Sequence, residues 1–414
     1  MRMFSLVVLV TCLQGCAQLA VSSAPAYAVI TGDSSLHAHE HRHVDVRPAR
    51  EFDFPALADG RQIAVVDLHT HSVFSDGHVW PTVRTWEAEK DGLDALAITE
   101  HLEYQPHADD IPHPDRNRAY NLAVESAARM PEAGLLVISG AEITRRLPPG
   151  HVNAVFITDA NALLTIDARE EDALENAREA LEEAKAQDAF VFWNHPAWPR
   201  DAPDGILKVP AAQQALIDDG LIQGIEVANG HYFSEETLQY ALDNDLVMLG
   251  TSDIHGLIDY DYDIEGGEHR TVTLVLTEGR SPEALKSALV SGKTVALYHN
   301  QFVGREAEVG PVMSAILTGE AGEMPRNSTV LQVTLRNSSS VPLLLRNLGP
   351  RRFSNASDIV TVPAQGEIIV NLNDAGALDP IVLDFEVLNS FIGVGKHLQL
   401  RVSVASAKSR LSAE

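Results

Sequence analysis

Two histidines one residue apart follow directly on a short apolar segment, and an Asp-Gly pair comes soon after them. The apolar segment covers residues 63–66, and the polar residues that follow include His69, His71, Asp76 and Gly77. Side chains alternate between the two faces of a β-strand, so His69 and His71 point to the same side. Two imidazoles on one side of a strand end can bind one divalent metal ion, and Asp76 lies within reach of a second. The stretch therefore predicts a metal site, although a pair of surface histidines before a turn has the same local pattern.

The chain is strongly acidic, which limits the partners that it can bind. Its 414 residues include 58 Asp and Glu against 31 Lys and Arg, a formal net charge of -27. Such a chain repels phosphate-rich polymers and anionic membrane surfaces, so we expect no nucleic acid partner. A small anionic substrate remains compatible with this charge if bound metal ions supply a local positive potential.

The N-terminus has the pattern of an export signal. Arg2 precedes an apolar run over residues 3–13, and residues 26–28 read Ala-Tyr-Ala, which is typical of a cleavage site. We therefore expect residues 1–28 to be the signal peptide of an exported, periplasmic protein. An alternative is lipid attachment at Cys16, because the residues that end there resemble a lipoprotein processing site. No other segment reaches the ~18 apolar residues that span a bilayer. Both cysteines lie in this signal region, so a mature protein would contain neither a disulfide nor a thiolate ligand.

Three further regions can be told apart by their patterns. Residues 29–60 contain four histidines that alternate with small and charged residues between positions 37 and 43, and we predict a solvated linker there, with a metal-collecting tail as the alternative. Residues 61–300 alternate short apolar strands with amphipathic helices, which predicts βα units, a parallel sheet and an α/β barrel wall that is apolar on both faces. The predicted strands cover residues 63–68, 95–99, 135–139, 152–157, 190–193, 222–227, 246–249 and 271–276. The predicted helices cover residues 80–90, 117–130, 170–185, 211–219, 235–244 and 282–291.

The pattern changes after about residue 300, where helical periodicity fades. Alternating or clustered apolar runs are separated by Asn, Gly and Pro turns, at residues 330–335, 341–345, 367–372, 381–387 and 397–404. This pattern predicts an all-β sandwich over residues 301–414. The residues that bind metals lie almost entirely before it, so we expect the sandwich to serve as a cap, a wall or a subunit contact, for example in a homo-oligomer.

Polar residues of the types that bind metals follow most of the predicted strands. They are His69, His71, Asp76, His101, Glu142, His151, His195, Asp253 and His255. The carboxyl ends of strands in a barrel of βα units converge on one mouth, where catalytic groups gather. His151 is the one awkward member, because it stands at the start of a predicted strand. Since a soluble core rarely contains so many ionisable side chains at strand ends, we predict a single multinuclear metal site.

These motifs resemble those of the PHP (polymerase and histidinol phosphatase) family, in order and over roughly residues 62–300. The resemblance implies a distorted seven-stranded barrel that holds up to three divalent ions, usually zinc, manganese or iron. It assigns His69, His71, Glu142 and Asp253 to one ion. It assigns Glu142, His151 and His195 to a second ion, and Asp76, His101 and His255 to a third. His107 or His113 are alternatives to His151. Amidohydrolases share the His-x-His start, but Asp76, His101 and the Asp253-x-His255 pair fit the three-metal pattern better.

Phosphoester hydrolysis suits this set of residues. A bridging carboxylate such as Glu142 holds two ions ~3.5–4 Å apart, and such a pair activates a bridging water and neutralises phosphoryl oxygens. Asp253 is our candidate to receive the proton of the nucleophile. Arg145 can bind a phosphate oxygen, or it is a surface arginine beside Arg146. His231 can donate a proton to the leaving group, or it is a structural histidine.

The signal, the β domain and the ligand set together resemble exported bacterial PHP proteins, some of which hydrolyse small alkyl or aryl phosphodiesters. We therefore expect an exported metal-dependent phosphodiesterase that acts on small-molecule phosphodiesters. The alternatives are a phosphomonoesterase or nuclease of the same family, and a non-catalytic metal-binding adaptor of the cell envelope.

Overall fold

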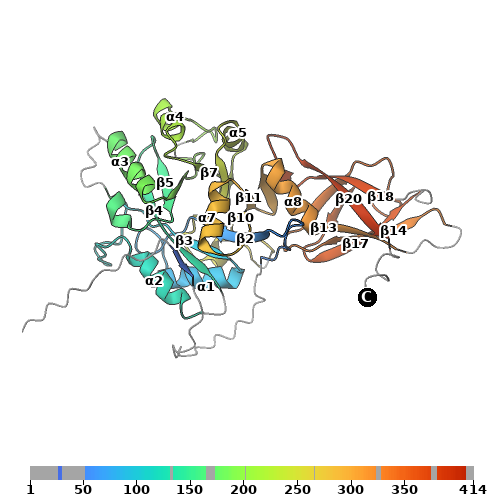
Figure 1. Ribbon diagram of the computed structural model, residues 1–414, viewed down its shortest axis with the longest axis horizontal. Coiled ribbons are helices and arrows are strands. Elements are labelled where there is room, and N and C mark those ends of the chain that lie inside the picture. Colours follow the sequence, from blue (N-terminus) through green and yellow to red (C-terminus); the bar gives the residue numbers. More distant parts are fainter. Residues whose placement is uncertain are drawn as a thin grey trace, which may run out of the picture.

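The computed structural model describes residues 27–29, 52–130, 134–164, 173–200, 202–264, 266–322, 328–373 and 380–406. Most of the predicted signal peptide, including Cys16, and most of the predicted linker lie outside the described residues. Figure 1 shows an α/β domain whose helices lie around a curled sheet, and an all-β domain that projects from one side of it. The predicted fold class, an α/β barrel followed by an all-β domain, is therefore confirmed.

One mixed sheet forms the wall of the α/β domain. Its central strands, in spatial order, are β2 (Gln62–Asp67), β3 (Ala95–Ile98), β4 (Leu136–Thr144), β5 (His151–Val155), β6 (Phe190–Trp193) and β7 (Gly224–Asn229). Beyond β2 lie β10 (Val272–Thr277), β11 (Thr294–Tyr298) and β12 (Gln301–Gly304), and β7 pairs with both β8 (Tyr232–Phe233) and β9 (Val247–Thr251). The short strand β1 (Tyr27–Val29) lies antiparallel to β4. The described residues of β3, β6, β7, β9 and β10 are buried throughout, which confirms a wall that is apolar on both faces.

The sheet curls until β9 faces β10 and β11. The hydroxyl of Thr273 donates to the carbonyl of Gly250 at 2.7 Å, and that of Thr294 donates to the carbonyl of Met248 at 2.8 Å. A Cβ on Gly250 would lie 2.7 Å from the carbonyl oxygen of Val272, so only glycine allows the two strands to approach so closely. Side-chain hydrogen bonds thus close the barrel where backbone pairing stops.

Helices cover the outside of this wall. They are α1 (Pro81–Asp91), α2 (Arg118–Ala127), the 3-10 turn η1 (Ala160–Leu163), α3 (Ala173–Ala186), α4 (Ala211–Asp218), α5 (Glu235–Asp243), α6 (Ile258–Asp261) and α7 (Pro282–Val290). Local sequence sets their starts: Ser281 accepts a hydrogen bond from the backbone of Ala284, with a proline at the first turn of α7. In α3 the predicted apolar face is buried except for Leu174, which is 39% exposed and borders the pocket described below.

The expectation of a parallel sheet was wrong at β10 and at β5. Strand β10 runs antiparallel to both β2 and β11, and β5 runs antiparallel to both β4 and β6. The connection between β4 and β5 covers only residues 145–150, which is too short for a crossover helix, so the chain turns back as a hairpin. The start of β5 therefore lies at the same end of the barrel as the carboxyl ends of the parallel strands. This direction accounts for His151, whose place at a strand start was the awkward point of the sequence pattern.

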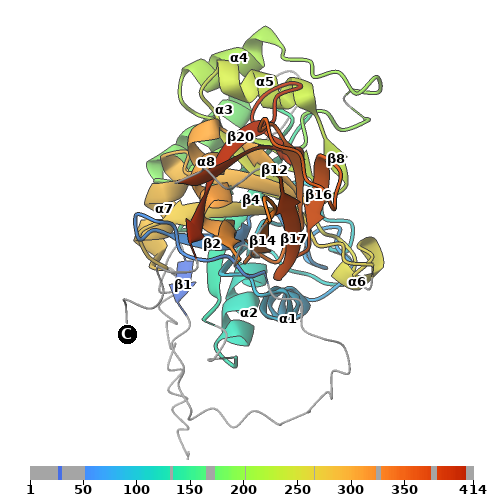
Figure 2. The same cartoon turned by 90° about the vertical axis from the view of Figure 1, so that its right-hand side faces the viewer.

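The C-terminal domain is a seven-stranded sheet that folds over on itself. Its spatial order is β16 (Ile359–Val362), β15 (Leu343–Asn347), β18 (Ile381–Val387), β20 (Leu398–Ser406), β13 (Leu317–Ala321), β14 (Leu331–Asn337) and β17 (Gly366–Leu372). Figure 2 views this sheet from its own side of the molecule. Inward residues of β14 such as Leu331, Val333 and Leu335 are buried while the residues between them are not, which is the alternation of a half-buried sheet.

The two domains share their core at the junction. The strand β19 (Ser390–Phe391) lies between two strands of the sandwich in sequence, yet it pairs with β12 of the barrel sheet. Helix α8 (Glu306–Ile316) lies between the domains and buries Val309, Val312, Met313 and Ile316. Our expectation that helical periodicity ends near residue 300 was wrong here, because a helix that is covered by both domains has no broad polar face. None of the helices in the described part of the chain has the length and apolarity needed to cross a bilayer.

Candidate metal centre

The nine predicted ligands meet at one mouth of the barrel. His69, His71 and Asp76 follow β2, His101 follows β3, Glu142 lies in β4, His151 begins β5, His195 follows β6, and Asp253 and His255 follow β9. Backbone hydrogen bonds join segments that are far apart in the sequence at this point, since the amide of Asp253 donates to the carbonyl of His69 at 2.9 Å. The convergence follows from strand order and direction, since neighbouring strands end at neighbouring positions on the rim.

Four of these residues form a buried inner cluster. Nε2 of His69 lies 3.0 Å from Nε2 of His71, and each of the two nitrogens lies 3.2 Å from Oε2 of Glu142. Both nitrogens also lie 3.1 Å from Oδ1 of Asp253. Imidazole nitrogens and carboxylate oxygens that lie this close together are spaced as the ligands of one divalent ion. The inner cluster is the set that the resemblance assigned to the first ion.

The second oxygen of Glu142 faces two more histidines. Its Oε1 lies 2.7 Å from Nδ1 of His151 and 3.9 Å from Nε2 of His195, which is also 3.9 Å from Oδ2 of Asp253. Neither Oε1 of Glu142 nor Nδ1 of His151 makes a hydrogen bond within the described residues, although both are buried. Within the described residues each of the two atoms thus has the other as its ion-pair partner, and a carboxylate oxygen and an imidazole nitrogen this close together can both bind one cation.

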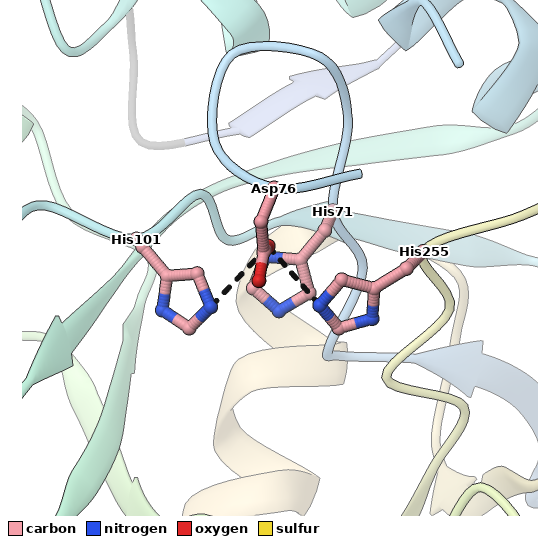
Figure 3. Close-up of side chains that lie close together, drawn as sticks. All are labelled: His71, Asp76, His101 and His255. Atoms are coloured by element: carbon pink, nitrogen blue, oxygen red, sulfur yellow. Dashed lines mark ion pairs between the residues drawn. The ribbon is translucent and has the colours of Figure 1, made fainter. Parts of the chain in front are cut away.

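Asp76 is the centre of a more open outer cluster. Figure 3 shows its carboxylate between the rings of His101 and His255, with His71 behind. Its Oδ1 lies 3.4 Å from Nε2 of His101 and 3.1 Å from Nε2 of His255. The side chains of Asp76 and His255 are 24% and 33% exposed, whereas those of the inner cluster, apart from Asp253, are fully buried. The outer cluster thus faces the pocket, and the inner cluster forms its floor.

The ionisable groups shift one another in opposite directions. Burial raises the pKa of the Glu142 carboxyl, but the neighbouring imidazoles, His101 and His151 foremost, lower it more, so it lies well below its usual range. Burial lowers the pKa of His71, but Asp253 and Glu142 raise it more, to about 10. Protons on the histidines therefore balance the carboxylates when no cation is bound. Divalent ions would replace those protons, because histidine ligands are neutral. The residues at this mouth thus fit a group of divalent metal ions in number, chemistry and spacing.

Glu226, in β7, supports the inner cluster and was missed by the sequence analysis. Its buried carboxylate accepts hydrogen bonds from Nδ1 of His69 at 2.7 Å, the amide of His195 at 2.7 Å and the hydroxyl of Thr251 at 2.6 Å. Because Nδ1 of His69 then carries the proton, Nε2 is left as the ligand atom. A lone glutamate inside an apolar strand was the available signal.

Arg84 in α1 joins the two loops that carry the outer cluster, and it was also missed. Its fully buried guanidinium donates to the carbonyls of His71 at 2.7 Å and His255 at 2.8 Å. Nη1 donates to the carboxylate of Glu87 at 2.6 Å, and Glu87 accepts from the amide of Ile258 at 2.9 Å. These contacts hold the loop after β2 against the loop after β9.

A pocket of about 1230 Å³ opens above the clusters. The residues that border it include Arg145, Arg146 and Arg200, and also His231 and Tyr262. Nη2 of Arg145 lies 2.9 Å from Oε1 of Glu103, and the side chain is only 7% exposed. The ion pair with Glu103 therefore fixes Arg145 in the pocket wall, and its side chain is not exposed as that of a surface arginine would be. His231 is an exposed residue that also borders the pocket.

The two alternatives to His151 lie elsewhere. Nδ1 of His113 donates to the carbonyl of Ile111 at 2.5 Å, and its ring packs edge-on against Phe74. His107 and His113 do not border the pocket. His151, by contrast, is the residue that reaches Glu142.

Comparison with known proteins places this geometry in a family. A family model described as an Ig-like domain matches residues 318–403, within the sandwich. The structure of a two-domain protein from Bacteroides vulgatus ATCC 8482, which contains a predicted PHP-like metal-dependent phosphoesterase, is 38% identical, covers 86% of this chain and 99% of that chain, and has a TM-score of 0.76. The chain therefore belongs to the PHP-like metal-dependent phosphoesterases, and the resemblance seen in the sequence is confirmed.

Two more distant structures also match. PsfC from Pseudomonas syringae PB-5123 is 22% identical and covers 57% of this chain and 92% of that chain, with a TM-score of 0.39. An amidohydrolase from Chromobacterium violaceum is 19% identical and covers 47% of this chain and 88% of that chain, with a TM-score of 0.34. Their TM-scores are too low to say anything about this chain. No curated protein matches it.

Proposed function

We propose that this protein is an exported phosphodiesterase that hydrolyses small-molecule phosphodiesters with the help of three divalent ions, zinc, manganese or iron. The observation that carries the proposal is the convergence of carboxylate and imidazole atoms on the floor of a pocket of about 1230 Å³. The inner cluster would hold one ion, Glu142 with His151 and His195 a second, and Asp76 with His101 and His255 a third. When bound, such ions lower the pKa of a water nucleophile and neutralise charge on a phosphoryl group.

The pocket favours an anionic substrate with two substituents. In a chain of net charge -27, three arginines border one pocket. They supply the local positive potential that an anionic ester needs, and Arg145 lies next to the β4 strand that carries Glu142. The pocket exceeds the space that a phosphate alone requires, which leaves room for groups on both ester oxygens. This room favours a diester over a monoester.

The chain's own residues take three roles in this proposal. Asp253, a member of the inner cluster that also borders the pocket, receives the proton that the nucleophile loses. Its pKa is raised by burial but lowered more by His69, His71 and His255, so the carboxylate starts ionised. Arg145 binds a phosphoryl oxygen. His231, which also borders the pocket, protonates the leaving oxygen.

The test is a comparison of substrates on the purified protein loaded with manganese or zinc. We expect hydrolysis of bis(4-nitrophenyl) phosphate to exceed that of 4-nitrophenyl phosphate, and Asp253→Asn to remove both activities. Asp204→Asn, an exposed change away from the pocket, is the matched control. Preference for the monoester or for oligonucleotides would support the two alternative enzymes instead. If no ester is hydrolysed, the remaining alternative is a non-catalytic metal-binding adaptor of the cell envelope.

We also propose that residues 61–300 are the catalytic domain, that residues 301–414 are the C-terminal domain, and that residues 1–28 direct export. The strand β1 spans the predicted cleavage site after Ala28 and pairs with β4. The N-terminal residue of the protein recovered from the periplasm would distinguish cleavage at Ala28 from lipid attachment at Cys16. Light scattering of the same sample would test for a homo-oligomer.

A further inference from the structure

One hairpin of the barrel contacts both the C-terminal domain and a residue that borders the pocket. Strands β11 and β12 of the barrel are joined by a two-residue turn, His299 and Asn300, with φ angles of 43° and 62°. Left-handed conformations at both positions are the geometry of a tight hairpin turn, and His and Asn tolerate it better than most residues. This turn lies between His231 on the pocket side and Asn389 of the C-terminal domain.

His299 contacts the residue that we propose as proton donor. Nε2 of His299 lies 3.4 Å from Nδ1 of His231. The next residue back, Tyr298, donates its hydroxyl to the carbonyl of His231 at 2.7 Å. On the other face, the ring of His231 packs against Tyr262 with 4.7 Å between centroids. Because His299 takes up Nδ1, the other nitrogen, Nε2, is the atom of His231 that can reach a substrate.

His299 can accept a hydrogen bond from Nδ1–H of His231. A donor histidine is doubly protonated, so its Nδ1–H needs an acceptor while Nε2–H faces the substrate. A neutral His299 with its proton on Nδ1 offers Nε2 as that acceptor, and Oε1 of Glu268 lies 3.7 Å from Nδ1 of His299. Burial lowers the pKa of His299 and Glu268 opposes this shift, with a net lowering that keeps the ring neutral near pH 7.

Asn389 holds the turn in place. Its Nδ2 donates to the carbonyl of Asn300 at 2.7 Å and to that of Pro342 at 2.9 Å, while its Oδ1 accepts from the amide of Leu344 at 3.0 Å. Its own carbonyl accepts from the amide of Phe302 at 2.9 Å, at the start of the pairing of β12 with β19. The side chain thus fastens the hairpin turn to two segments of the C-terminal domain.

A second series of contacts also joins the C-terminal domain to His231. The ring of Phe391 in β19 lies 5.7 Å from that of Phe233, which stacks on Tyr298 at 6.0 Å. Tyr298 in turn holds the carbonyl of His231. Both paths start in β19 or next to it, and both end at His231.

We propose that Asn389 of the C-terminal domain is a positioning residue, which holds the His299 turn so that His299 keeps His231 oriented as the proton donor to the leaving oxygen. The proposal rests on the phosphodiesterase function proposed above and assigns the C-terminal domain a part in it. As the bond from phosphorus to the leaving oxygen breaks, its electron pair stays on that oxygen, which takes the proton from Nε2 of His231. His231 is left neutral and regains a proton from water at the exposed rim.

Leaving-group dependence tests this role, because a poor leaving group needs the proton and a good one does not. The full-length, metal-loaded protein is compared on methyl phenyl phosphate and methyl 4-nitrophenyl phosphate. We expect His231→Gln to lower kcat/KM about 100-fold on the phenyl ester, the low end of what general acid catalysis supplies, and only a few-fold on the nitrophenyl ester. His299→Gln and Asn389→Ala should lower it about 10-fold on the phenyl ester with the same selectivity.

Asn355→Ala is the matched control. Asn355 also bonds to backbone within the C-terminal domain, at 2.9 Å from the carbonyl of Ile369, but it does not touch the hairpin turn. It should leave both rates unchanged. If Asn389→Ala does not fold, His299→Gln, a change at a part-exposed turn, carries the test alone.

The failures can be told apart. Wild-type protein that hydrolyses neither ester contradicts the proposed function and this inference with it. Wild-type activity with a selective loss in His231→Gln, but equal losses or none in both His299→Gln and Asn389→Ala, overturns the positioning role only. Equal losses on both esters in His231→Gln overturn the donor role.

Discussion

The barrel and the C-terminal domain differ in where they place charged side chains. In the barrel, Asp67, Arg270 and Asp91 form a fully buried network behind the metal ligands, and Nη2 of Arg270 lies 2.7 Å from Oδ2 of Asp91. In the C-terminal domain the charged pairs, such as Arg336 with Glu367, lie on the solvent face, with side chains about half exposed. Buried charges cost free energy unless they are paired, whereas exposed pairs contribute little in either direction. The difference indicates that the barrel is built around its site and that the C-terminal domain is built for stability and contact.

The largest expected effect is the loss of a ligand from the inner cluster. Asp253→Asn removes a negative ligand atom that lies 3.1 Å from two imidazole nitrogens, and it also removes the proposed proton acceptor. We expect kcat to fall by on the order of 10³-fold or more, with loss of bound metal. Steady-state kinetics and elemental analysis of the same sample measure both. A variant that keeps its metal and most of its rate would remove Asp253 from the site.

A smaller loss of metal affinity or activity is expected when a residue that supports a proposed ligand is changed. Glu226→Gln keeps the size of the side chain but weakens the acceptor that holds the Nδ1 proton of His69. Substitution of such supporting residues commonly lowers metal affinity or activity by about 10- to 100-fold. Metal titration by calorimetry would measure it, with Glu235→Gln at the half-buried start of α5, outside the pocket, as the control. Unchanged affinity would mean that Glu226 serves the fold alone.

The metal-free barrel should lose stability as the solution becomes alkaline. The pKa of His71 in the folded protein is about 10, above its ordinary value of 6.5. Protonation of His71 therefore favours the folded state fully below pH 6.5, and this contribution is lost as the pH rises toward 10. We expect the Tm of the metal-free protein to fall over that range. The metal-loaded protein should not follow, because its ligands are already deprotonated. A Tm that rises with pH in the metal-free protein would contradict the charge state described here.

The smallest effect belongs to the surface of the C-terminal domain. Glu367→Gln breaks a pair with 2.8 Å between Nη2 of Arg336 and Oε2 of Glu367, and should lower the free energy of unfolding by less than about 1 kcal/mol. Asp91→Asn in the barrel leaves Arg270 short of a buried partner and should cost about 3–5 kcal/mol. Urea unfolding of the two variants compares the domains directly. Equal losses would abolish the contrast between them.

Much of the site followed from residue type and strand pattern. The histidines and carboxylates after β2, β3, β6 and β9 are short-range signals, since the strand end and the ligand are neighbours in sequence. His151 was also among the candidates from the strand pattern, but it stood at a strand start, and this position was explained only once β5 proved antiparallel. Strand direction depends on the partner strand, which local periodicity does not reveal.

What escaped prediction depends on tertiary contacts. Glu226 looks like a strand residue and Arg84 like a helix residue, and their roles lie in bonds to distant loops. Strand β11 and helix α8 were overlooked because both are almost wholly apolar at the junction of the domains. Asn389 also escaped prediction, because its role depends on a contact with the turn at Asn300 that joins two domains.

The number of metal ions bound per chain tests the central claim most directly. The clusters around Asp253, His151 and Asp76 predict three ions per chain in the wild-type protein, measured by elemental analysis after removal of free metal. His255→Gln, which changes only the outer cluster, should retain two ions with the inner cluster intact. Wild-type protein that retains no metal, or a His255→Gln variant that retains as many ions as the wild type, would contradict a barrel mouth built as a three-ion site.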